Sequence, residues 1–272
     1  MSEKVIQKLK SEPKNRGYII MIVAIVLFMI IWSSSVINFE SATKDGTEVA
    51  KNIIKGIFNP KKEMLFNLTT KGVPYLLLET MCIAFLGTLV GAIIAMPLSF
   101  LASSNIVAAP IAYLVRLLII LIRTIPSIVY GLMFIRVTGP GPFAGLMTMS
   151  FTSIGMLTKL FSDNIMNLNK AILESFSSIG ATTFQKIRFG IIPQLFANFA
   201  STTIYRFDIN LRDAAVLGLV GAGGIGSPLM FAINSYKWQE VGAILLGLII
   251  LVLFIEYFST KIRARLVGEK WN

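Results

Sequence analysis

A cluster of glycines in "LGLVGAGGIGSPL", residues 217–229, has the spacing of a phosphate-binding loop. Gly221, Gly223 and Gly226 form G-x-G-x-x-G, the pattern that holds the pyrophosphate of a dinucleotide. That loop needs a buried strand before it, an amphipathic helix after it and an acidic residue about twenty positions further on. Here a charged apolar run precedes the glycines and a proline follows almost at once. We therefore expect no dinucleotide site, and predict that these glycines and Gly224 form a gate or hinge of bendable backbone.

Charged residues inside the preceding apolar run form a second candidate site: Arg206, Asp208, Arg212 and Asp213. An unpaired charge at the centre of a bilayer costs about 2.5–3.5 kcal/mol on insertion scales. Asp208 and Arg212 stand at i and i+4 with the acid first, the favourable order for an ion pair on a helix. Arg206 and Asp213 share a similar face but are too far apart to pair directly. The set is either a buried ion-pair network that holds helices in register, or the lining of a polar pathway or a dimer-interface switch.

Arg123 and Pro126, in "LIRTIPSIVYGLMFI", are further candidates for a translocation pathway. An anionic solute in a channel of low dielectric needs positive charge or oriented amide groups to offset its own charge. Arg123 and Arg212 could supply that charge. The alternative is that each of them pairs with Asp208 or Asp213.

The lack of histidine excludes several kinds of catalytic site. The chain has no histidine among its 272 residues, and Cys82 is its only cysteine. Ser-His-Asp and Cys-His catalysis, histidine metal ligands and a disulfide within the chain are therefore excluded. The pattern G-x-x-x-x-G-K-[ST] of a Walker loop is also missing. We expect no catalytic residue, no metal site and no resident cofactor.

The composition is that of an integral membrane protein. Hydrophobic residues make up 55% of the chain, charged residues only 14%, and the mean hydropathy is +0.74. Soluble domains carry about 25% charged residues, so this chain cannot cover itself with polar surface in water. The net charge of +11 fits basic cytoplasmic flanks better than a nucleic-acid partner. We expect an all-α integral membrane protein and no nucleic acid.

Apolar runs predict about six transmembrane helices. Each run is long enough, at about 1.5 Å per residue, to cross a hydrocarbon core of about 30 Å. The third run contains Pro126 and is equally well described as two short helices with a bend, and the second is expected to break or bend near Pro97. The runs are Tyr18–Ile37, Val73–Ala102, Ala108–Val137, Phe143–Phe161, Gln194–Leu219 and Val241–Phe258.

An even number of spans places both basic termini on one side, which the positive-inside rule assigns to the cytoplasm. We divide the chain into residues 1–72, a tail, a first anchor and a polar linker, and residues 73–272, the core. Six lysines in the linker oppose this orientation. The segment "VAKNIIKGIF" within it has helical spacing of apolar residues, which is typical of a short helix on the membrane surface.

A polar segment at about residues 162–193 interrupts the apolar runs on the cytoplasmic side. Its apolar residues recur every three to four positions, which predicts amphipathic helices that do not span the membrane. We expect a turn at Gly180 and a helix end at Pro193. The segment either packs on its own membrane domain or on lipid, or docks a soluble partner.

The stretch "ESFSSIGATTFQKIRFGIIP" resembles the EAA loop of ABC-transporter permeases. Glu174, Gly180 and Pro193 stand at the positions of that pattern. Ser175 and Phe176 replace its two alanines. Its final isoleucine and leucine are replaced by Gly190 and Ile192.

Two flanking stretches strengthen the resemblance. "LIRTIPSIVYGLMFI" and "DINLRDAAVLGLVGAGGIG" are similar to segments of permeases for phosphonate-type importers, and the resemblance runs from about Leu76 to the C-terminus. It implies a type I ABC importer permease core in a prokaryotic cytoplasmic membrane, for a phosphonate, phosphite or phosphate. It also implies a second permease subunit (a homodimer is expected), an ATP-binding subunit dimer that holds ATP and Mg²⁺, and an extracytoplasmic solute-binding protein.

In this family the residues that couple to the ATPase are those of the EAA loop. The resemblance thus gives that role to Glu174, Ser175, Phe176, Gly180, Gly190 and Pro193. Alternatives to the whole interpretation are a permease for another solute, such as an amino acid, and a stand-alone channel or secondary carrier. A membrane-embedded enzyme is disfavoured by the missing histidine.

Overall fold

The computed structural model describes residues 16–36 and 44–268, which form helices joined by turns and contain no β-strand. The expectations for the basic tail 1–15, for residues 37–43 and for residues 269–272 lie outside the described residues. The contacts divide the chain into two units, residues 1–51 and 52–272.

The first unit contains α2 (Arg16–Val36), the helix expected for the first span. Its 21 residues reach about 30 Å at 1.5 Å per residue. Residues 17–34 have a mean hydropathy of 2.4 and are exposed throughout. Apolar residues surround the whole helix, as in a segment that faces lipid on all sides.

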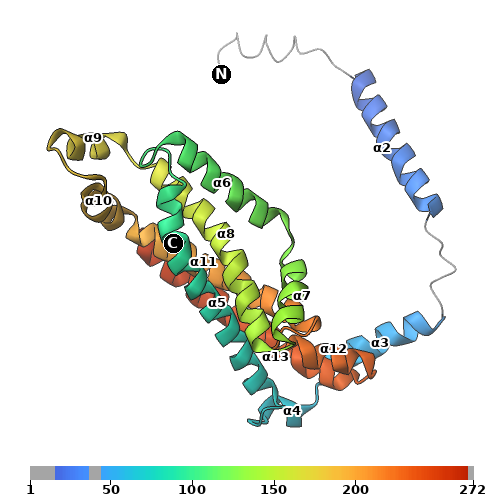
Figure 1. Cartoon of the computed structure of the whole chain (residues 1–272). Helices are drawn as coiled ribbons and strands as arrows, with labels where there is room; N and C mark the ends of the chain where they lie inside the picture. The colour runs from blue at the N-terminus through green and yellow to red at the C-terminus, as the bar shows by residue number, and fades with distance from the viewer. Residues whose placement is uncertain (1–15, 37–43, 269–272) are drawn as a thin grey trace. The chain divides into compact units, whose positions relative to one another are not determined.

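The second unit is a helical bundle (Figure 1). It starts within α3 (Lys44–Phe58) and continues with α4 (Lys62–Phe66), α5 (Val73–Leu101), α6 (Ala109–Thr124), α7 (Ser127–Thr138), α8 (Pro142–Met166), α9 (Lys170–Ser178), α10 (Thr183–Gln185), the π-helix η2 (Lys186–Ile191), α11 (Ile192–Leu219), α12 (Gly226–Asn234) and α13 (Trp238–Val267).

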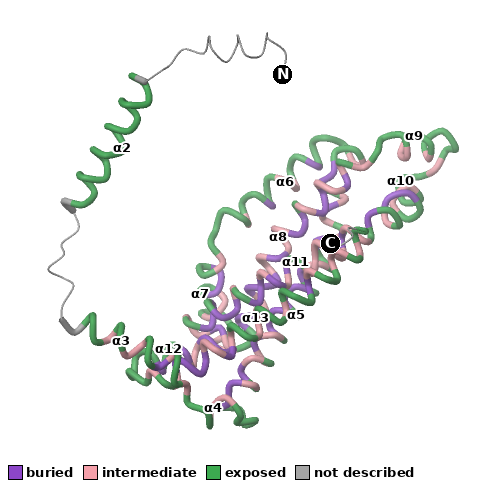
Figure 2. Tube along the Cα trace, turned by 180° about the vertical axis from the view of Figure 1, so that it is seen from behind, coloured by how far each residue is buried: buried purple, intermediate pink, exposed green. Residues whose placement is uncertain are grey.

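The centre of the bundle is the pair α5 and α8, against which α11 and α13 pack. Gly87 and Gly91 of α5 allow the close approach, since a β-carbon at these positions would collide with Met149 and Ser153 of α8. Small residues at i and i+4 are typical of helix pairs that pack closely in membranes. Buried residues concentrate where these helices meet, whereas α6 is exposed along nearly its whole length (Figure 2).

The expected third span is broken, as its proline predicts. Helices α6 and α7 meet at a break of two residues, Ile125 and Pro126, and are bent by 86°. The residue before a proline is pushed out of helical geometry, and Ile125 is accordingly extended. In contrast, α5 runs unbroken through Pro97, where we expected a break or bend.

Three described helices, α2, α5 and α13, are long and apolar enough to cross a membrane, and the bent pair α6–α7 would make a fourth. Helices α8 and α11 have 25 and 28 residues but fall short of this measure of apolarity. Polar side chains buried between helices lower their hydropathy. The count of six spans and the cytoplasmic placement of the termini therefore stay predictions.

Residues 52–72, which we assigned to the linker, pack on the core. Gly56 lies so close to the start of α13 that a β-carbon there would collide with the carbonyl of Trp238. Met64 and Leu65 of α4 pack against a buried cluster that includes Val73 and Ile244. These residues therefore cover the end of the bundle at which α5 and α13 begin. We call residues 52–72 the α3–α4 elbow.

Candidate functional site

Helices α9 and α10 project from one end of the bundle (Figure 1), where the resemblance places the coupling loop. The side chain of Asn169 caps α9 by accepting a hydrogen bond from Ala171 N at 3.0 Å. Gly180 has a φ of +73°, so the expected turn at Gly180 is present. Thr182 and Gln185 then form a capping box that starts α10. The sequence therefore builds two short helices in a fixed turn, exposed to solvent.

The polar residues of this loop are free to meet a partner. Glu174 is exposed, and its carboxylate makes no hydrogen bond or ion pair within the described part of the chain. Ser175 is exposed too, and its hydroxyl donates to the carbonyl of Ala171. An unpaired carboxylate on an exposed helix is suited to a basic group of another protein.

Phe176 and Gly190 lie against each other, although both depart from the EAA pattern. A β-carbon on Gly190 would lie 3.0 Å from Phe176 Cε2 and 3.2 Å from Cδ2. The large residue at position 176 thus occupies the space that the missing side chain at position 190 leaves free. The two departures compensate each other, and they fix α9 on η2.

Pro193 does not end a helix, contrary to our expectation. It lies in the first turn of α11, and the chain is helical without interruption from Thr183 to Leu219. The reason is the π-helical stretch η2, in which Ile192 N donates to the carbonyl of Ile187, five residues back. Pro193 has no N–H to donate and its ring would crowd the carbonyl four residues back, so the wider turn before it lets the helix continue.

Several large apolar side chains of this region are exposed: Ile179, Phe184, Phe189 and Phe196 are 77%, 67%, 60% and 62% exposed. The guanidinium of Arg188 lies 5.5 Å from the ring centre of Phe189. Such an apolar surface with a free carboxylate beside it can bind a soluble partner.

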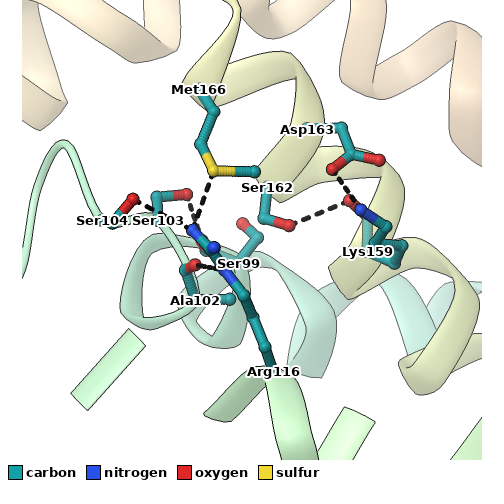
Figure 3. A network of polar contacts seen from close by, with 9 residues as sticks. All are labelled: Ser99, Ala102, Ser103, Ser104, Arg116, Lys159, Ser162, Asp163 and Met166. Carbon is teal, nitrogen blue, oxygen red and sulfur yellow. Dashed lines mark hydrogen bonds and ion pairs between the residues drawn. The ribbon is translucent and has the colours of Figure 1, made fainter. Parts of the chain in front are cut away.

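Arg116 fastens the neighbouring turn between α5 and α6 (Figure 3). It donates to the carbonyl of Ala102 at 2.7 Å, to Ser104 Oγ at 3.1 Å and to Met166 Sδ at 2.8 Å. The last turn of α8, which leads into the coupling loop, is thereby tied to the α5–α6 turn.

The predicted charged set of α11 splits over different surroundings. Arg206 is 6% exposed and is bonded to hydroxyls and a sulfur of α8: Ser153 Oγ at 3.1 Å, Thr152 Oγ1 at 3.0 Å and Met156 Sδ at 3.1 Å. Asp208 is 4% exposed and pairs with Arg212 at 2.9 Å, as the i, i+4 spacing predicted. Arg212 also reaches Glu256 of α13 at 3.4 Å.

Asp213 is half-buried, and its carboxylate makes no ion pair or hydrogen bond within the described residues. The structure brings Asp208, Arg212 and Glu256 together, whereas the hydrogen bonds of Arg206 go to neutral groups and Asp213 attracts its charge from a longer distance. The expected pair of Asp208 and Arg212 is therefore present, and the role of the set as an ion-pair network or as a pathway lining stays a prediction.

Arg123 and Pro126 lie at the α6–α7 bend, away from these pairs. Both are exposed, and no ion pair or hydrogen bond joins Arg123 to α11 in the described chain. The side-chain stem of Arg123 lies against Gly155 of α8. Its charge is therefore available to a solute or to lipid.

Asn210 is a functional candidate that we missed. It is fully buried and donates to Thr88 Oγ1 of α5 and to Ser153 Oγ of α8, both at 2.8 Å. Its oxygen Oδ1 is buried without a hydrogen-bond partner in the described structure. Its position four residues after Arg206 places both on one face of α11, the only signal in the sequence that could have found it.

The glycine cluster is a tight packed loop between α11 and α12. Gly221, Gly223 and Gly224 have φ of +99°, +82° and +70°. Gly226, the first residue of α12, has no room for a side chain because Ala215 and Gly218 lie against it. Without a strand before it, the loop lacks the setting of a dinucleotide site.

Two residues of α5 hold this loop, and we missed both. Gly224 N donates to Glu79 Oε1 at 3.1 Å, and Ile225 N donates to Thr80 Oγ1 at 2.9 Å. Thr80 in turn donates to the carbonyl of Leu76 at 2.7 Å. On the other side, Gly141 N donates to the carbonyl of Gly221 at 2.9 Å. The loop thus joins α5, α8, α11 and α12.

The described residues contain no group of three or more His, Cys, Asp and Glu that could hold a metal ion.

Comparison with known proteins gives consistent relatives. Residues 87–266 match the family described as "Binding-protein-dependent transport system inner membrane component". The chain is 32% identical over 188 residues to the phosphite transport system permease protein PtxC of Stutzerimonas stutzeri, covering 69% of this chain and 68% of that protein. It is 31% identical over 190 residues to the phosphate-import permease protein PhnE of Mycolicibacterium smegmatis, covering 70% of this chain and 36% of that protein.

A solved structure has the same fold. An inward-facing structure of the MetNI methionine ABC transporter contains a chain that aligns with a TM-score of 0.61 and 20% identity, over 70% of this chain and 94% of that one.

Proposed function

The chain belongs to the family of binding-protein-dependent transport system inner membrane components, and on that premise we propose that its solute is a small phosphorus oxyanion. It is a multi-pass protein of the prokaryotic inner membrane and the permease subunit of an ABC importer. Its family implies an ATP-binding subunit and a solute-binding protein as partners.

The observation that carries the proposed solute is the identity of 31–32% to permeases named for phosphite and phosphate, over about 70% of this chain. The charge agrees with an anion, since Arg123 is exposed at the α6–α7 bend and has no carboxylate partner in the described structure. A phosphite, phosphonate or phosphate would gain from such a guanidinium, which binds oxyanions with two parallel hydrogen bonds. Arg212, by contrast, is already paired with two carboxylates.

The energy for transport comes, in this proposal, from an ATPase dimer that docks on α9 and α10. The free carboxylate of Glu174 and the exposed rings of Phe184 and Phe189 support docking there. ATP and Mg²⁺ bind to the partner, so the permease holds no cofactor and hydrolyses nothing itself. A second copy of the chain completes the pathway as a homodimer.

Transport proceeds by a switch between two states. ATP binding draws the coupling loops of the two permeases together, and the pathway opens outward to receive the solute from the binding protein. Hydrolysis returns it to the inward-facing state. Between the loop and the pathway, α11 is continuous with the coupling loop through η2, so a displacement of α10 is passed along one helix.

The test is uptake into proteoliposomes that contain the permease, its own ATPase and its own binding protein. Phosphite, phosphate and a simple phosphonate are offered in turn, and methionine and glycine betaine serve as competitors. We expect ATP-dependent uptake of at least one phosphorus oxyanion, which neither competitor inhibits. Uptake of an amino acid or betaine in its place would give the solute of the alternative interpretation.

A second experiment tests whether transport depends on the ATPase. Glu174→Trp and Gly180→Val should abolish co-purification of the ATPase together with uptake, because bulky residues block an exposed docking surface. Unchanged uptake with no ATPase bound would show a self-sufficient channel or carrier.

A further inference from the structure

A spacious cleft among the described residues lies at the end of the bundle opposite α9 and α10. It has a volume of about 970 Å³. The end of α3, the start of α13 and the turns beside them form its walls. Its lining includes three lysines, one glutamate and two aromatic residues of the α12–α13 turn: Lys55, Lys61, Lys237, Glu240, Tyr236 and Trp238.

The cleft is built firmly. Gly56 of α3 and Gly242 of α13 are in backbone contact, and a β-carbon at either position would collide with the other helix. Lys61 N donates to the carbonyl of Gln239 at 3.1 Å, and Lys61 Nζ pairs with Glu240 at 3.2 Å. The two walls are therefore held at a fixed separation.

The charge in the cleft is positive. Glu240 offsets part of it, through Lys61 and through Lys237 at 3.8 Å. The side-chain ammonium of Lys55 makes no ion pair or hydrogen bond within the described residues. Three lysines facing one carboxylate leave an excess of positive charge, which an anion can neutralise.

The cleft also lies at the level where candidate membrane spans begin. The candidate spans Val73–Leu101 and Trp238–Val267 both begin at this end of the bundle. Next to it, apolar side chains of the α3–α4 elbow are turned outward: Ile54, Phe58, Phe66 and Leu68 are 56%, 85%, 80% and 82% exposed. Apolar side chains beside lysines and a tryptophan at the start of a span are typical of the headgroup level.

We propose that this cleft binds the headgroup of an anionic phospholipid, with Lys55 and Lys237 on its phosphate and the α3–α4 elbow inserted among the acyl chains. This use gives a role to Lys55 and Lys61, two of the linker lysines that the positive-inside rule leaves unexplained. A lipid suits the cleft better than an acidic protein does, because exposed apolar side chains flank it at the level where the spans begin.

Trp238 provides the readout, after Trp32→Phe and Trp271→Phe have removed the other tryptophans. The full-length permease is placed in nanodiscs that contain brominated phosphatidylglycerol or brominated phosphatidylcholine, and the quenching of Trp238 is compared. We expect stronger quenching by phosphatidylglycerol. In the double variant Lys55→Ser/Lys237→Ser, the affinity for phosphatidylglycerol relative to phosphatidylcholine, obtained from the quenching, should fall about 30-fold. This fall corresponds to about 1 kcal/mol for each lysine near an anionic surface.

The matched control is Lys62→Ser/Lys71→Ser, which removes the same charge from exposed lysines outside the cleft. It should keep the preference. Equal quenching by both lipids, or an equal loss in both double variants, would overturn the proposal. A third result would also overturn it: the double variant Lys55→Ser/Lys237→Ser keeps its lipid preference, but the binding protein no longer stimulates uptake. The cleft would then be a docking site for a protein. The readout needs no transported solute, so failure of the proposed solute leaves it unaffected.

Discussion

Phe176 and Gly190 both depart from the EAA pattern, and their packing explains the two residues only when they are considered together. The phenylalanine replaces a small residue and the glycine replaces a large one, and the ring lies where the absent side chain would be. Each change alone would therefore leave either a gap or a clash. The position of α9 on η2 depends on their combined size.

A double-mutant cycle tests this compensation. Phe176→Ala removes the contact, and Gly190→Ile drives a side chain into the ring, so each alone should lower co-purification of the ATPase. The double variant Phe176→Ala/Gly190→Ile should recover most of it, with a coupling energy of about 1–3 kcal/mol, as expected for residues in contact. Additive losses in the double variant would show that the two positions act separately.

Arg206 is a buried charge whose bonded partners are neutral. Removing a guanidinium from water is costly, and hydroxyls and a sulfur offset that cost less well than a carboxylate does. Arg206→Met keeps the length of the side chain and removes the charge, so the thermal midpoint of the purified permease should stay equal or rise. Arg206→Glu in the same place should lower it. A clearly lower midpoint for Arg206→Met would show that the polar bonds to α8 stabilise the fold.

At the scale of elements, the glycine loop is fixed more firmly than a hinge of loose backbone. Its amides are held by Glu79 and Thr80 of α5, and a β-carbon at Gly224 would lie 2.7 Å from Thr80 Oγ1. A gate or hinge at this position would therefore require the loop and α12 to move together as one rigid body. The loop would move against α5, where two hydrogen bonds define the contact.

Gly224→Val tests the role of this loop. Valine is strained by about 1–2 kcal/mol at a φ of +70° and also collides with Thr80. Uptake should fall at least tenfold, while the ATPase still co-purifies, because the coupling loop lies at the other end of the bundle. Thr80→Val, which removes the hydrogen bond to Ile225 N, should act in the same direction, and Thr80→Ser should restore uptake. Normal uptake in Gly224→Val would remove the loop from the transport cycle.

The elements that could be predicted are those whose signal is local. Apolar runs predicted α2, α5, α11 and α13, and proline predicted the α6–α7 bend, since hydropathy and φ restrictions act within a few residues. Partners distant in sequence could not be predicted. The contact of Glu79 with Gly224 joins residues 145 positions apart, and neither residue type indicates the other.

Three further features of the fold could not be predicted from the sequence, because they depend on packing or on an altered hydrogen-bond register. Helix α12 follows the glycines without a strong apolar run, α5 passes through Pro97 unbroken, and η2 absorbs the proline at the start of α11. In each case tertiary contacts or an altered hydrogen-bond register outweigh the local signal. Of the candidate site, the pair Asp208–Arg212 and the turn at Gly180 were predicted in place, whereas Asn210 and Thr80 were found only in the structure.

For the whole molecule, the separation of the coupling loop from the lysine-lined cleft requires a definite topology. If the ATPase meets α9 and α10 in the cytoplasm, the opposite end with α12 and the α3–α4 elbow must face the outside. About six spans with both termini inside satisfy this arrangement, and the lysines of the elbow then lie at the outer surface. Their attraction to anionic lipid offsets the preference of lysine for the cytoplasmic side, since both effects are of the order of 1 kcal/mol per charge.

Single cysteines in a Cys82→Ala background can establish this topology. Gly180→Cys and Tyr236→Cys place thiols at two exposed positions, one at each end of the bundle. In intact cells a membrane-impermeant maleimide should label position 236 and leave position 180 unlabelled, and after lysis both should react. Of the helices between the two residues, α11 with its 28 residues is the one long enough to span, so labelling of both from outside would mean that α11 does not cross the membrane. The number of spans would then be odd, and the two termini would lie on opposite sides.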